Sequence, residues 1–436
     1  MPLSRYVKIW PCPDRPGCII LYSTRKGSVV RIPESRLDDI TSGNAGEAET
    51  AALQRVGILV EDRDRERQEM ETLMEQTNSR SRMFRAKVAL NLDCNLACPY
   101  CFEGNFRKKQ YMSEETAGLL VEHVRNHLRK GGDVRLGFYG GEPLLSIPLI
   151  TEISTRLLEE AGQTGSSYTF SLTTNGTLLT RKVVEKLLPL GLTGAIVTLD
   201  GPRHIHDRQR PFVSGKGSFD VIVTNIAEVA NLTEVQIGGN FTEENYREFP
   251  TMLDVLKERG IGPEKLGFVE FAPIMPKTGG LVGTDSGHGC ISSSEPWVAE
   301  AALFLREETL KRGFAVKKTT MSACVVEMEN DLVVNWDGAL YKCPGFMGWP
   351  EMSVGTLAQG VGDYRESHNL DLWKREECLD CAYLPLCFGG CRLITLMSHG
   401  AIDRVDCRKA LLDKTLREIV LQDMRYRKRS PEKREP

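Results

Sequence analysis

The stretch LNLDCNLACPYC at residues 90–101 places three cysteines directly after an apolar segment that is predicted to be a β-strand. Cys94, Cys98 and Cys101 are separated by three and by two residues. Thiolates this close can reach one metal centre, and three protein ligands leave a fourth position open for another molecule. The spacing favours a reactive iron–sulfur cluster. A zinc site with a fourth ligand elsewhere and three buried thiols are the alternatives.

Outward from this stretch, from residue 85 onward, short apolar segments alternate with longer helical ones. This alternation predicts an α/β fold in which six β/α units form a parallel sheet curled into a barrel or partial barrel. In such folds chemistry lies at the C-terminal ends of the strands. Cys94, Gly140, Asn175 and Asp200 each follow a predicted strand, so we expect one pocket to gather them. The predicted strands are Lys87–Leu92, Val134–Tyr139, Tyr168–Thr174, Ala195–Leu199, Val235–Gly239 and Gly267–Phe271, and the predicted helices include Ser113–Lys130, Ile147–Ala161 and Thr180–Leu190.

The flanking regions have different patterns. Residues 1–80 predict a small α/β module with strands at Tyr6–Trp10, Cys18–Tyr22, Ser28–Ile32 and Gly57–Val60, followed by a charged helix at 61–76. Glu295–Arg312 predicts a helix, and beyond it turns and short β segments carry seven cysteines between residues 324 and 407. The charged end at 425–436 predicts disorder. The expected division is 1–80 for the N-terminal module, 81–289 for the core, 290–412 for the cysteine-rich domain and 413–436 for a helix and tail.

Composition excludes several classes of protein. The chain has 436 residues, of which 41% are hydrophobic and 26% charged, and its net charge is −3. This balance excludes wholesale disorder and argues against nucleic-acid binding, which needs a basic surface. No apolar run approaches the length of a membrane span, and the first residues lack a signal-peptide pattern. We therefore expect a cytoplasmic protein with no membrane and no nucleic-acid partner.

The 13 cysteines are an odd number, and most of them cluster, which in a reducing compartment points to metal rather than to disulfides. Cys12 and Cys18 frame a Pro/Gly turn, and idle thiols are expected there. His204 and His206 follow Asp200 but are expected to be structural.

CNLACPYC (94–101) and FYGGEPLL (138–145), together with TTNGTLL (173–179), TLDGPRHIHDRQRPF (198–212) and GKGSFD (215–220), resemble the radical S-adenosylmethionine (radical SAM) enzymes. The resemblance implies a partial, TIM-like (β/α)6 barrel. It also implies a [4Fe–4S] cluster on Cys94, Cys98 and Cys101, whose open iron binds the amino and carboxylate groups of S-adenosylmethionine.

The same resemblance implies roles for residues around the cofactor. Tyr100 and Phe102 would flank the adenine. Gly140, Gly141 and Glu142 would bind the methionine ammonium group. Thr174, Asn175 and Thr198 fall where the family contacts the ribose or the carboxylate. Asn175 as a turn residue before Gly176 and Thr198 as a packing residue remain the alternatives.

The C-terminal cysteines resemble the SPASM extension of radical enzymes that act on peptides and proteins. The resemblance implies two auxiliary [4Fe–4S] clusters, and thus three clusters in all. Cys378, Cys381, Cys387 and Cys407 would bind one, and Cys324, Cys343 and Cys391 the other. Cys290 is the candidate for the fourth ligand of the latter, with an open iron site as the alternative. A pair of zinc knuckles is the alternative to both clusters, because four thiolates also suit zinc.

LNLDCNLACPYCFEG, DGALYKCPGF and CAYLPLCFGGCR most closely resemble the geopeptide-type radical SAM peptide maturases. The resemblance implies that an electron from a donor such as ferredoxin or flavodoxin leads to a 5′-deoxyadenosyl radical. This radical would remove hydrogen from a ribosomally synthesised precursor peptide. A thioether crosslink is the expected product, with a carbon–carbon or ether link as alternatives. Residues 1–80 are compatible with leader-peptide recognition by an edge strand, or they cap the barrel.

Two other functions compete with this one. The anaerobic sulfatase-maturating enzymes share the fold and the clusters, but in that family an aspartate follows the cysteine equivalent to Cys343, where this chain has Pro344. A non-enzymatic iron–sulfur or zinc protein, acting in electron transfer or as an interaction module, would account for the cysteines. It would not account for the GGEP and TTNGT segments.

Overall fold

The computed structural model of the chain describes residues 1–101, 109–274 and 295–426. These residues form two compact units. Among the described residues, the barrel unit comprises those within 81–317, 329–368 and 425–426, and the composite unit comprises residues 1–80, 318–328 and 369–424.

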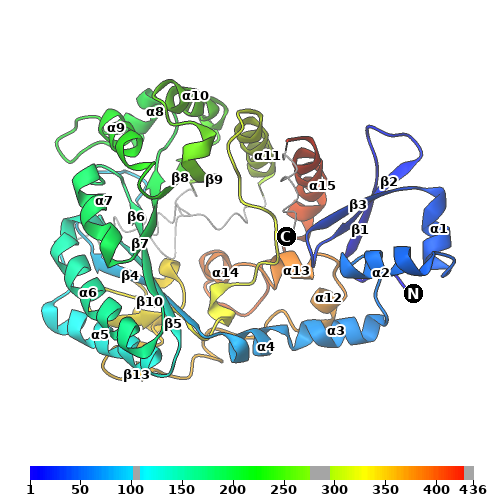
Figure 1. Cartoon of the computed structure of the whole chain (residues 1–436), viewed down its shortest axis with the longest axis horizontal. Coiled ribbons are helices and arrows are strands. Elements are labelled where there is room, and N and C mark those ends of the chain that lie inside the picture. Colours follow the sequence, from blue (N-terminus) through cyan, green and yellow to red (C-terminus); the bar gives the residue numbers. More distant parts are fainter. Residues whose placement is uncertain (102–108, 275–294, 427–436) are drawn as a thin grey trace. The chain divides into compact units, whose positions relative to one another are not determined.

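A ten-stranded sheet organises the barrel unit (Figure 1). Six neighbouring strands run parallel in chain order, which confirms the α/β prediction of an open, partial barrel. Beyond β4 the sheet continues through β10, which is parallel to β4, and then through three short antiparallel strands. The parallel strands are β4 Met83–Asn91, β5 Asp133–Gly140, β6 Tyr168–Thr174, β7 Leu192–Thr198, β8 Glu234–Phe241 and β9 Leu266–Pro273, and the others are β10 Asp331–Val334, β11 Ala339–Tyr341, β12 Gly355–Thr356 and β13 Gly360–Val361.

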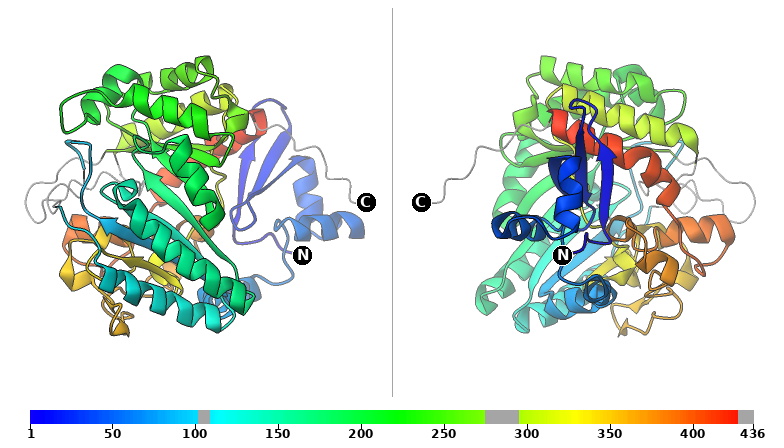
Figure 2. Two further views of the ribbon diagram at one scale, coloured as in Figure 1. Left: turned by 60° about the vertical axis from the view of Figure 1, so that its left-hand side comes forward. Right: turned by 90° about the vertical axis from the view of Figure 1, so that its right-hand side faces the viewer.

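Helices cover one face of this sheet (Figures 1 and 2). The first of them begins after Ser113, whose hydroxyl accepts the N–H of Thr116 at 3.0 Å, as an N-cap should. Apolar residues of the strands and helices, such as Phe138 and Phe170, pack edge to face in one core. The helices are α5 Glu114–Arg129, α6 Ile147–Thr164, α7 Arg181–Leu187, α8 Arg203–Gln209, α9 Phe219–Val229, α10 Pro250–Glu258 and α11 Pro296–Lys311.

The other face of the sheet carries polar or small residues. Because side chains alternate along a strand, the residues between the core positions share this face. Lys87, Gly137, Ser171 and Gly194 lie side by side in register across β4 to β7. A Cβ atom on Gly137 would lie 2.9 Å from the Lys87 side chain, so this glycine makes room for Lys87 on that face.

The composite unit begins with an antiparallel sheet in the order β1-β2-β3. Its strands are β1 Val7–Pro11, β2 Cys18–Ser23 and β3 Ser28–Pro33, and its helices are α1 Ser35–Thr41, α2 Glu47–Arg55, α3 Arg63–Glu71, α4 Leu73–Arg80, α12 Glu376–Leu379, α13 Leu384–Cys387, α14 Arg392–His399 and most of α15 Lys409–Tyr426.

Two sequence predictions for this region are wrong. The strand expected at Gly57–Val60 is reduced to a single bridge between Leu59 and Leu3, because the chain turns away on either side. The single helix expected over 61–76 is two helices, since α3 ends at Glu71 and α4 starts at Leu73.

The composite unit has hydrophobic cores that join distant parts of the sequence. In one, Tyr6 and Met70 from the N-terminal residues pack with Trp373 and Phe388 from the cysteine-rich region. In another, Ile20 and Tyr22 pack with Tyr383, Leu416 and Val420. Residues 1–80 and the cysteine-rich segment therefore support each other's folding. Among the described helices, none combines the length and the apolar character that crossing a membrane requires.

Candidate active site

The loop after β4 lies against the turn after β5. The N–H groups of Gly141 and Glu142 donate to the carbonyl oxygens of Asn91 and Asp93 at 3.0 and 2.7 Å. A Cβ atom on Gly141 would lie 2.1 Å from the Asp93 oxygen, and one on Gly140 would lie 2.2 Å from the Asn91 oxygen. Only glycine allows this approach. The Gly-Gly pair is thus required to seat the start of the cysteine loop.

A polar network joins the cysteine loop to the end of β6. Asn175 donates from Nδ2 to Asn95 Oδ1 at 2.8 Å, and the same nitrogen lies 3.6 Å from Cys94 Sγ. Its Oδ1 accepts the N–H and the hydroxyl of Thr177 at 2.9 and 2.7 Å. Asn95 Nδ2 closes the network on the Thr177 hydroxyl at 2.8 Å. Asn175 is therefore a buried amide directed at the cysteine loop, and it contributes more than a turn.

Glu142 is fully buried and its carboxylate accepts three hydrogen bonds. Oε1 accepts the Leu144 N–H at 3.0 Å and the Thr174 hydroxyl at 2.7 Å, and Oε2 accepts the Asn175 N–H at 2.8 Å. Burial raises the pKa of this carboxyl, while the bonds from Asn175, Thr174 and Leu144 act in the opposite direction. The structure thus shows Glu142 as the residue that ties the β5 turn to the end of β6.

A second cluster surrounds Tyr100, and its arginine and asparagine were not predicted from the sequence. The Tyr100 hydroxyl donates to Asp200 and accepts from Arg210 Nη1 at 2.5 Å. Asn240, in β8, donates its N–H to Asp200 Oδ1 at 2.8 Å and its Nδ2 to the Tyr100 hydroxyl at 3.3 Å. All four residues are buried. The segment 198–212 contained Arg210, but nothing local indicated which partner it would meet.

This cluster is electrostatically coupled to Cys98. Burial opposes the charge of Arg210, but Cys98, Tyr100 and Asp200 around it raise its pKa well above the usual value. A guanidinium that stays charged beside Cys98 stabilises the thiolate form that a metal ligand requires. The cluster also fixes the Tyr100 ring at the rim of the cysteine loop.

The remaining predicted residues fall in several places. Thr174 and Thr198 end β6 and β7. His206 is fully buried, accepts the Asp200 N–H at 3.1 Å on Nδ1 and contacts Ser218 through Nε2, which makes it a structural group. His204 is exposed beside Glu248. Phe102 and Cys290 lie outside the described residues.

Four cysteines of the predicted SPASM region come together in the composite unit. Burial raises the pKa of Cys378 to about 11, and Cys387, Cys407 and Cys381 act on it in the same direction. The mutual effect places these thiols within electrostatic range of one another. Among the described residues, no group of three or more His, Cys, Asp or Glu side chains is arranged to hold a single metal ion. Four soft thiolate donors of this kind suit an iron–sulfur cluster and also suit zinc.

Cys324 and Cys391 also lie together in the composite unit. Burial raises the pKa of Cys324, the charge of Arg392 lowers it, and Cys391 raises it further. Cys391 caps helix α14, and its N–H donates to Asp406 Oδ2 at 3.0 Å. Cys343 belongs to the barrel unit, where it follows β11 and precedes a 3-10 turn at Pro344–Phe346.

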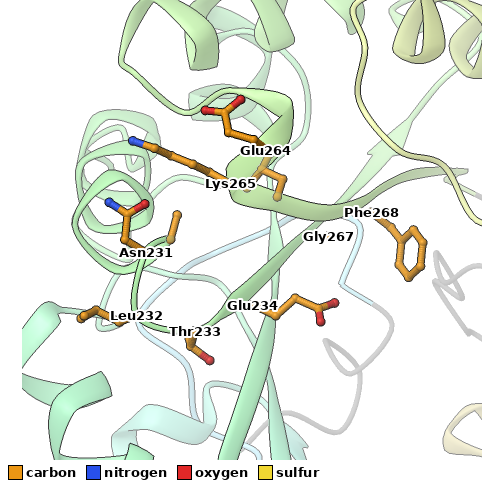
Figure 3. A pocket seen from close by; sticks show the side chains of 10 residues that line it. Asn231, Leu232, Thr233, Glu234, Glu264, Lys265, Gly267 and Phe268 are labelled. Carbon is orange, nitrogen blue, oxygen red and sulfur yellow. The ribbon is translucent and has the colours of Figure 1, made fainter. Parts of the chain in front are cut away.

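A surface hollow of about 560 Å³ lies at the opposite end of the strands from the cysteine loop. Residues of the turns before β8 and β9 line it, including Thr233, Glu234, Lys265 and Phe268 (Figure 3). In parallel folds chemistry belongs to the other end of the strands. We therefore do not assign this hollow to the active site.

Comparison with known proteins agrees with this geometry. Residues 90–256 match the Radical SAM superfamily. The chain is 30% identical to the Fe-coproporphyrin III synthase of Methanosarcina barkeri over 172 residues, which are 38% of this chain and 39% of the synthase. The chain thus spans only about two fifths of that relative. It is 24% identical to the cysteine-type anaerobic sulfatase-maturating enzyme of Clostridium novyi, over 77% of this chain and 96% of that enzyme.

The fold is also shared with a solved structure. SuiB of Streptococcus suis, determined bound to the precursor peptide SuiA, superimposes with a TM-score of 0.54 at 14% identity. The alignment covers 94% of this chain and 99% of SuiB. Residues 90–256 are thus identified as a Radical SAM superfamily domain, and the likeness to SuiB extends a shared fold over most of the chain.

Proposed function

We propose that this protein is a radical SAM maturase that abstracts hydrogen from a ribosomally synthesised precursor peptide and installs a crosslink, with a thioether as the leading product. One observation carries the proposal. The three-cysteine loop is seated by the Gly140-Gly141 turn and Asn175 in the barrel unit, while a separate four-cysteine group gathers in the composite unit. A structural metal protein needs the second feature but not the first.

The proposed first site uses Cys94, Cys98 and Cys101 as ligands of a [4Fe–4S] cluster that, with S-adenosylmethionine, supplies the 5′-deoxyadenosyl radical. Around it, Gly140, Gly141 and Glu142 are proposed to bind the methionine ammonium group, and Tyr100 and Phe102 to flank the adenine. Thr174, Asn175 and Thr198 are proposed to contact the ribose or the carboxylate.

The residues of this chain have defined tasks in the proposal. Glu142 and Asn175 hold the two turns at a fixed separation through their 2.8 Å hydrogen bond, which orients any ligand on the cysteine loop. Arg210 and Asp200 hold the Tyr100 hydroxyl, so the ring has one orientation. Both arrangements are buried, so water does not compete for their hydrogen bonds.

Two auxiliary [4Fe–4S] clusters complete the proposal. Cys378, Cys381, Cys387 and Cys407 are proposed to hold one. Cys324, Cys343 and Cys391 are proposed to hold the other, with Cys290 as the candidate fourth ligand. The soft thiolate donors suit iron–sulfur clusters. These clusters are proposed to take up the electron that bond formation releases, and a ferredoxin or flavodoxin to deliver the electron that starts the reaction.

The sheet β1-β2-β3 is proposed to bind the leader of the precursor. The N–H of Cys12 donates to the carbonyl oxygen of Cys18 at 2.9 Å, and the N–H of Thr24 donates to that of Tyr6 at 2.8 Å. These bonds lie at the two ends of the β1-β2 pair, and bonded pairs alternate along an antiparallel ladder. The even-numbered residues of β2 therefore bond to β1. By the same alternation, the N–H groups of Ile9 and Val29 face the outer edges of β1 and β3. Both side chains are exposed, at 39% and 38%. An extended peptide can add to such an edge by backbone bonds.

Sulfatase maturation is the second candidate, favoured by the long alignment with the Clostridium novyi enzyme. Pro344 follows Cys343 in this chain and offers no proton-accepting group where that family has an aspartate. This difference favours the peptide crosslink.

Co-expression with a candidate precursor peptide from a small neighbouring open reading frame, followed by mass spectrometry of the peptide, tests the proposal. A loss of two hydrogens that localises to a cysteine and a second residue is expected. Conversion of a sulfatase peptide to formylglycine would instead support the second candidate. Absence of S-adenosylmethionine cleavage under dithionite would reject both enzymes.

A further inference from the structure

A fully buried ion pair lies next to the cysteines at 324 and 391. Arg392 begins helix α14 directly after Cys391, and its side chain is 1% exposed. Its Nη2 lies 2.5 Å from Oε1 of Glu327, whose side chain is 2% exposed. Glu327 Oε2 accepts the Asp371 N–H at 3.3 Å. The pair is therefore held by the composite unit alone.

Glu327 accepts a hydrogen bond from only one of the three guanidinium nitrogens of Arg392. Nη2 also donates to the Asn369 carbonyl at 3.4 Å, but Nε and Nη1 have no hydrogen-bond partner among the described residues. Buried donors are nearly always paired, because leaving them unpaired in the interior is unfavourable. Two unpaired nitrogens on one buried cation indicate an acceptor that the protein side chains do not supply.

The neighbouring cysteines indicate what this acceptor is. The backbone N–H groups of Val326 and Arg392 are directed at the Cys324 sulfur, and Arg392 follows Cys391 directly in the chain. Cys391 acts on the same thiol. The unpaired donors of Arg392 thus lie near the sulfur atoms of Cys324 and Cys391, which are proposed to hold a cluster. Sulfur atoms of an iron–sulfur cluster accept hydrogen bonds, and such bonds set its reduction potential.

We propose that Arg392 is a positioning residue for the auxiliary cluster on Cys324 and Cys391. Its Nε and Nη1 groups donate hydrogen bonds to sulfur atoms of the cluster. These bonds and the positive charge raise the reduction potential of this cluster. The inference rests on the proposed function, because it requires that cluster. A fixed positive charge and two donors favour the reduced cluster, which carries one more negative charge. Glu327 holds the guanidinium in place and offsets part of its charge.

The test uses the full chain with Cys94, Cys98 and Cys101 replaced by alanine, so that only auxiliary clusters contribute. About eight irons per chain are expected from two cubane clusters. In this background, Arg392→Lys keeps the charge but loses the planar fork of donors. The double change Arg392→Met with Glu327→Gln removes both charges together, which avoids leaving a buried carboxylate unpaired. Arg375→Met, at a surface arginine of the same unit, is the matched control.

Potentiometric titration followed by electron paramagnetic resonance is the measurement. In the double variant, one of the two midpoint potentials should become more negative. In Arg392→Lys the same potential should shift in the same direction by a smaller amount. The other potential, the iron content and the Arg375→Met protein should match the parent. A loaded double variant with both potentials unchanged overturns the role of Arg392 alone. A parent that holds no auxiliary iron overturns the cluster assignment in the proposed function, and the role of Arg392 with it.

Discussion

The carboxylate of Glu142 accepts the backbone N–H of Asn175 at 2.8 Å, which joins the loops after two neighbouring strands at the edge where the cysteine loop begins. Because Asn175 also directs its Nδ2 toward Cys94, a change at Glu142 is transmitted to the cysteine loop through one residue. This relationship gives Glu142 a positioning role in addition to its proposed contact with an ammonium group.

Glu142→Gln should weaken binding of S-adenosylmethionine while the iron content stays unchanged. The carboxylate faces three donors, and a glutamine amide would turn its own N–H groups toward one of them. A mismatched buried donor costs about 1–3 kcal/mol, so affinity should fall roughly 10-fold to 100-fold. Equilibrium dialysis of the reconstituted protein measures this. Thr174→Val, which removes one of the three donors, is the control and should have the smaller effect. Unchanged affinity in Glu142→Gln would reduce Glu142 to a turn residue.

Alanine at Cys94, Cys98 and Cys101 together should remove about a third of the iron, given three cubane clusters, and all formation of 5′-deoxyadenosine. These residues are proposed to hold the reactive cluster. Cys12→Ala with Cys18→Ala is the matched control, because these thiols pack among apolar residues of the composite unit and are assigned no metal. Product formation by the triple variant would show that the reactive cluster has been assigned to the wrong cysteines.

Gly141→Ala should abolish cleavage of S-adenosylmethionine without unfolding the protein. The added Cβ would lie 2.1 Å from the Asp93 carbonyl oxygen, so the cysteine loop must shift. Gly118→Ala is the control, since no atom lies within 4 Å of a Cβ there and the position is helical. It should retain activity and gain about 1 kcal/mol of stability. Activity of Gly141→Ala equal to that of the control would show that the close contact is not needed.

His206 should make the barrel unit less stable in acid. Burial and the charge of Arg210 lower its pKa to about 3, from an ordinary value of 6.5. A lowered pKa means that the unfolded chain binds the proton more readily, so this stabilisation is complete above pH 6.5 and is lost as the pH falls toward 3. Between pH 7 and 5 the loss is about 2 kcal/mol.

Thermal unfolding of the intact protein and of His206→Asn, each at pH 7 and at pH 5, measures this loss. The asparagine cannot take up a proton, so its unfolding should depend less on pH. Equal pH dependence in the two proteins would assign the acid sensitivity to other groups.

Proline at one outer edge of the β1-β2-β3 sheet should prevent processing of the precursor. Ile9→Pro and Val29→Pro each remove one outward N–H and leave the bonds to β2 in place. If a leader adds to one edge, one variant loses crosslinking of the full-length precursor and the other keeps it, while both still cleave S-adenosylmethionine. Full processing by both variants would reject edge addition.

Point variants are preferable to removal of residues 1–80. The N-terminal residues supply Tyr6, Met70 and Ile20 to cores that also contain Trp373 and Phe388, or Leu416 and Val420. A chain that starts at Ser81 would expose these apolar side chains, and its loss of activity would report misfolding of the cysteine-rich segment rather than loss of leader binding.

The sequence by itself determined the features that depend on neighbouring residues. Strand β6 spans the predicted residues, and Ser113 caps α5 as expected, because alternation and capping involve only a few positions along the chain. The cysteine loop and the Gly-Gly turn were located in the same way, since spacing and glycine content are local properties. The strand expected at Gly57–Val60 is only a single bridge to Leu3, because a strand extends only as far as its partner continues beside it.

Only the tertiary structure decided which distant groups meet. Tyr100, Asp200, Arg210 and Asn240 span 140 residues of sequence and converge because β7 and β8 end beside the cysteine loop. The ion pair of Arg392 with Glu327 likewise joins residues that are far apart in the sequence, and so do the shared cores of the composite unit. Burial makes such contacts strong, because an interior charge or donor must find a partner. That partner is chosen by the packing of the whole unit, and no local pattern encodes it.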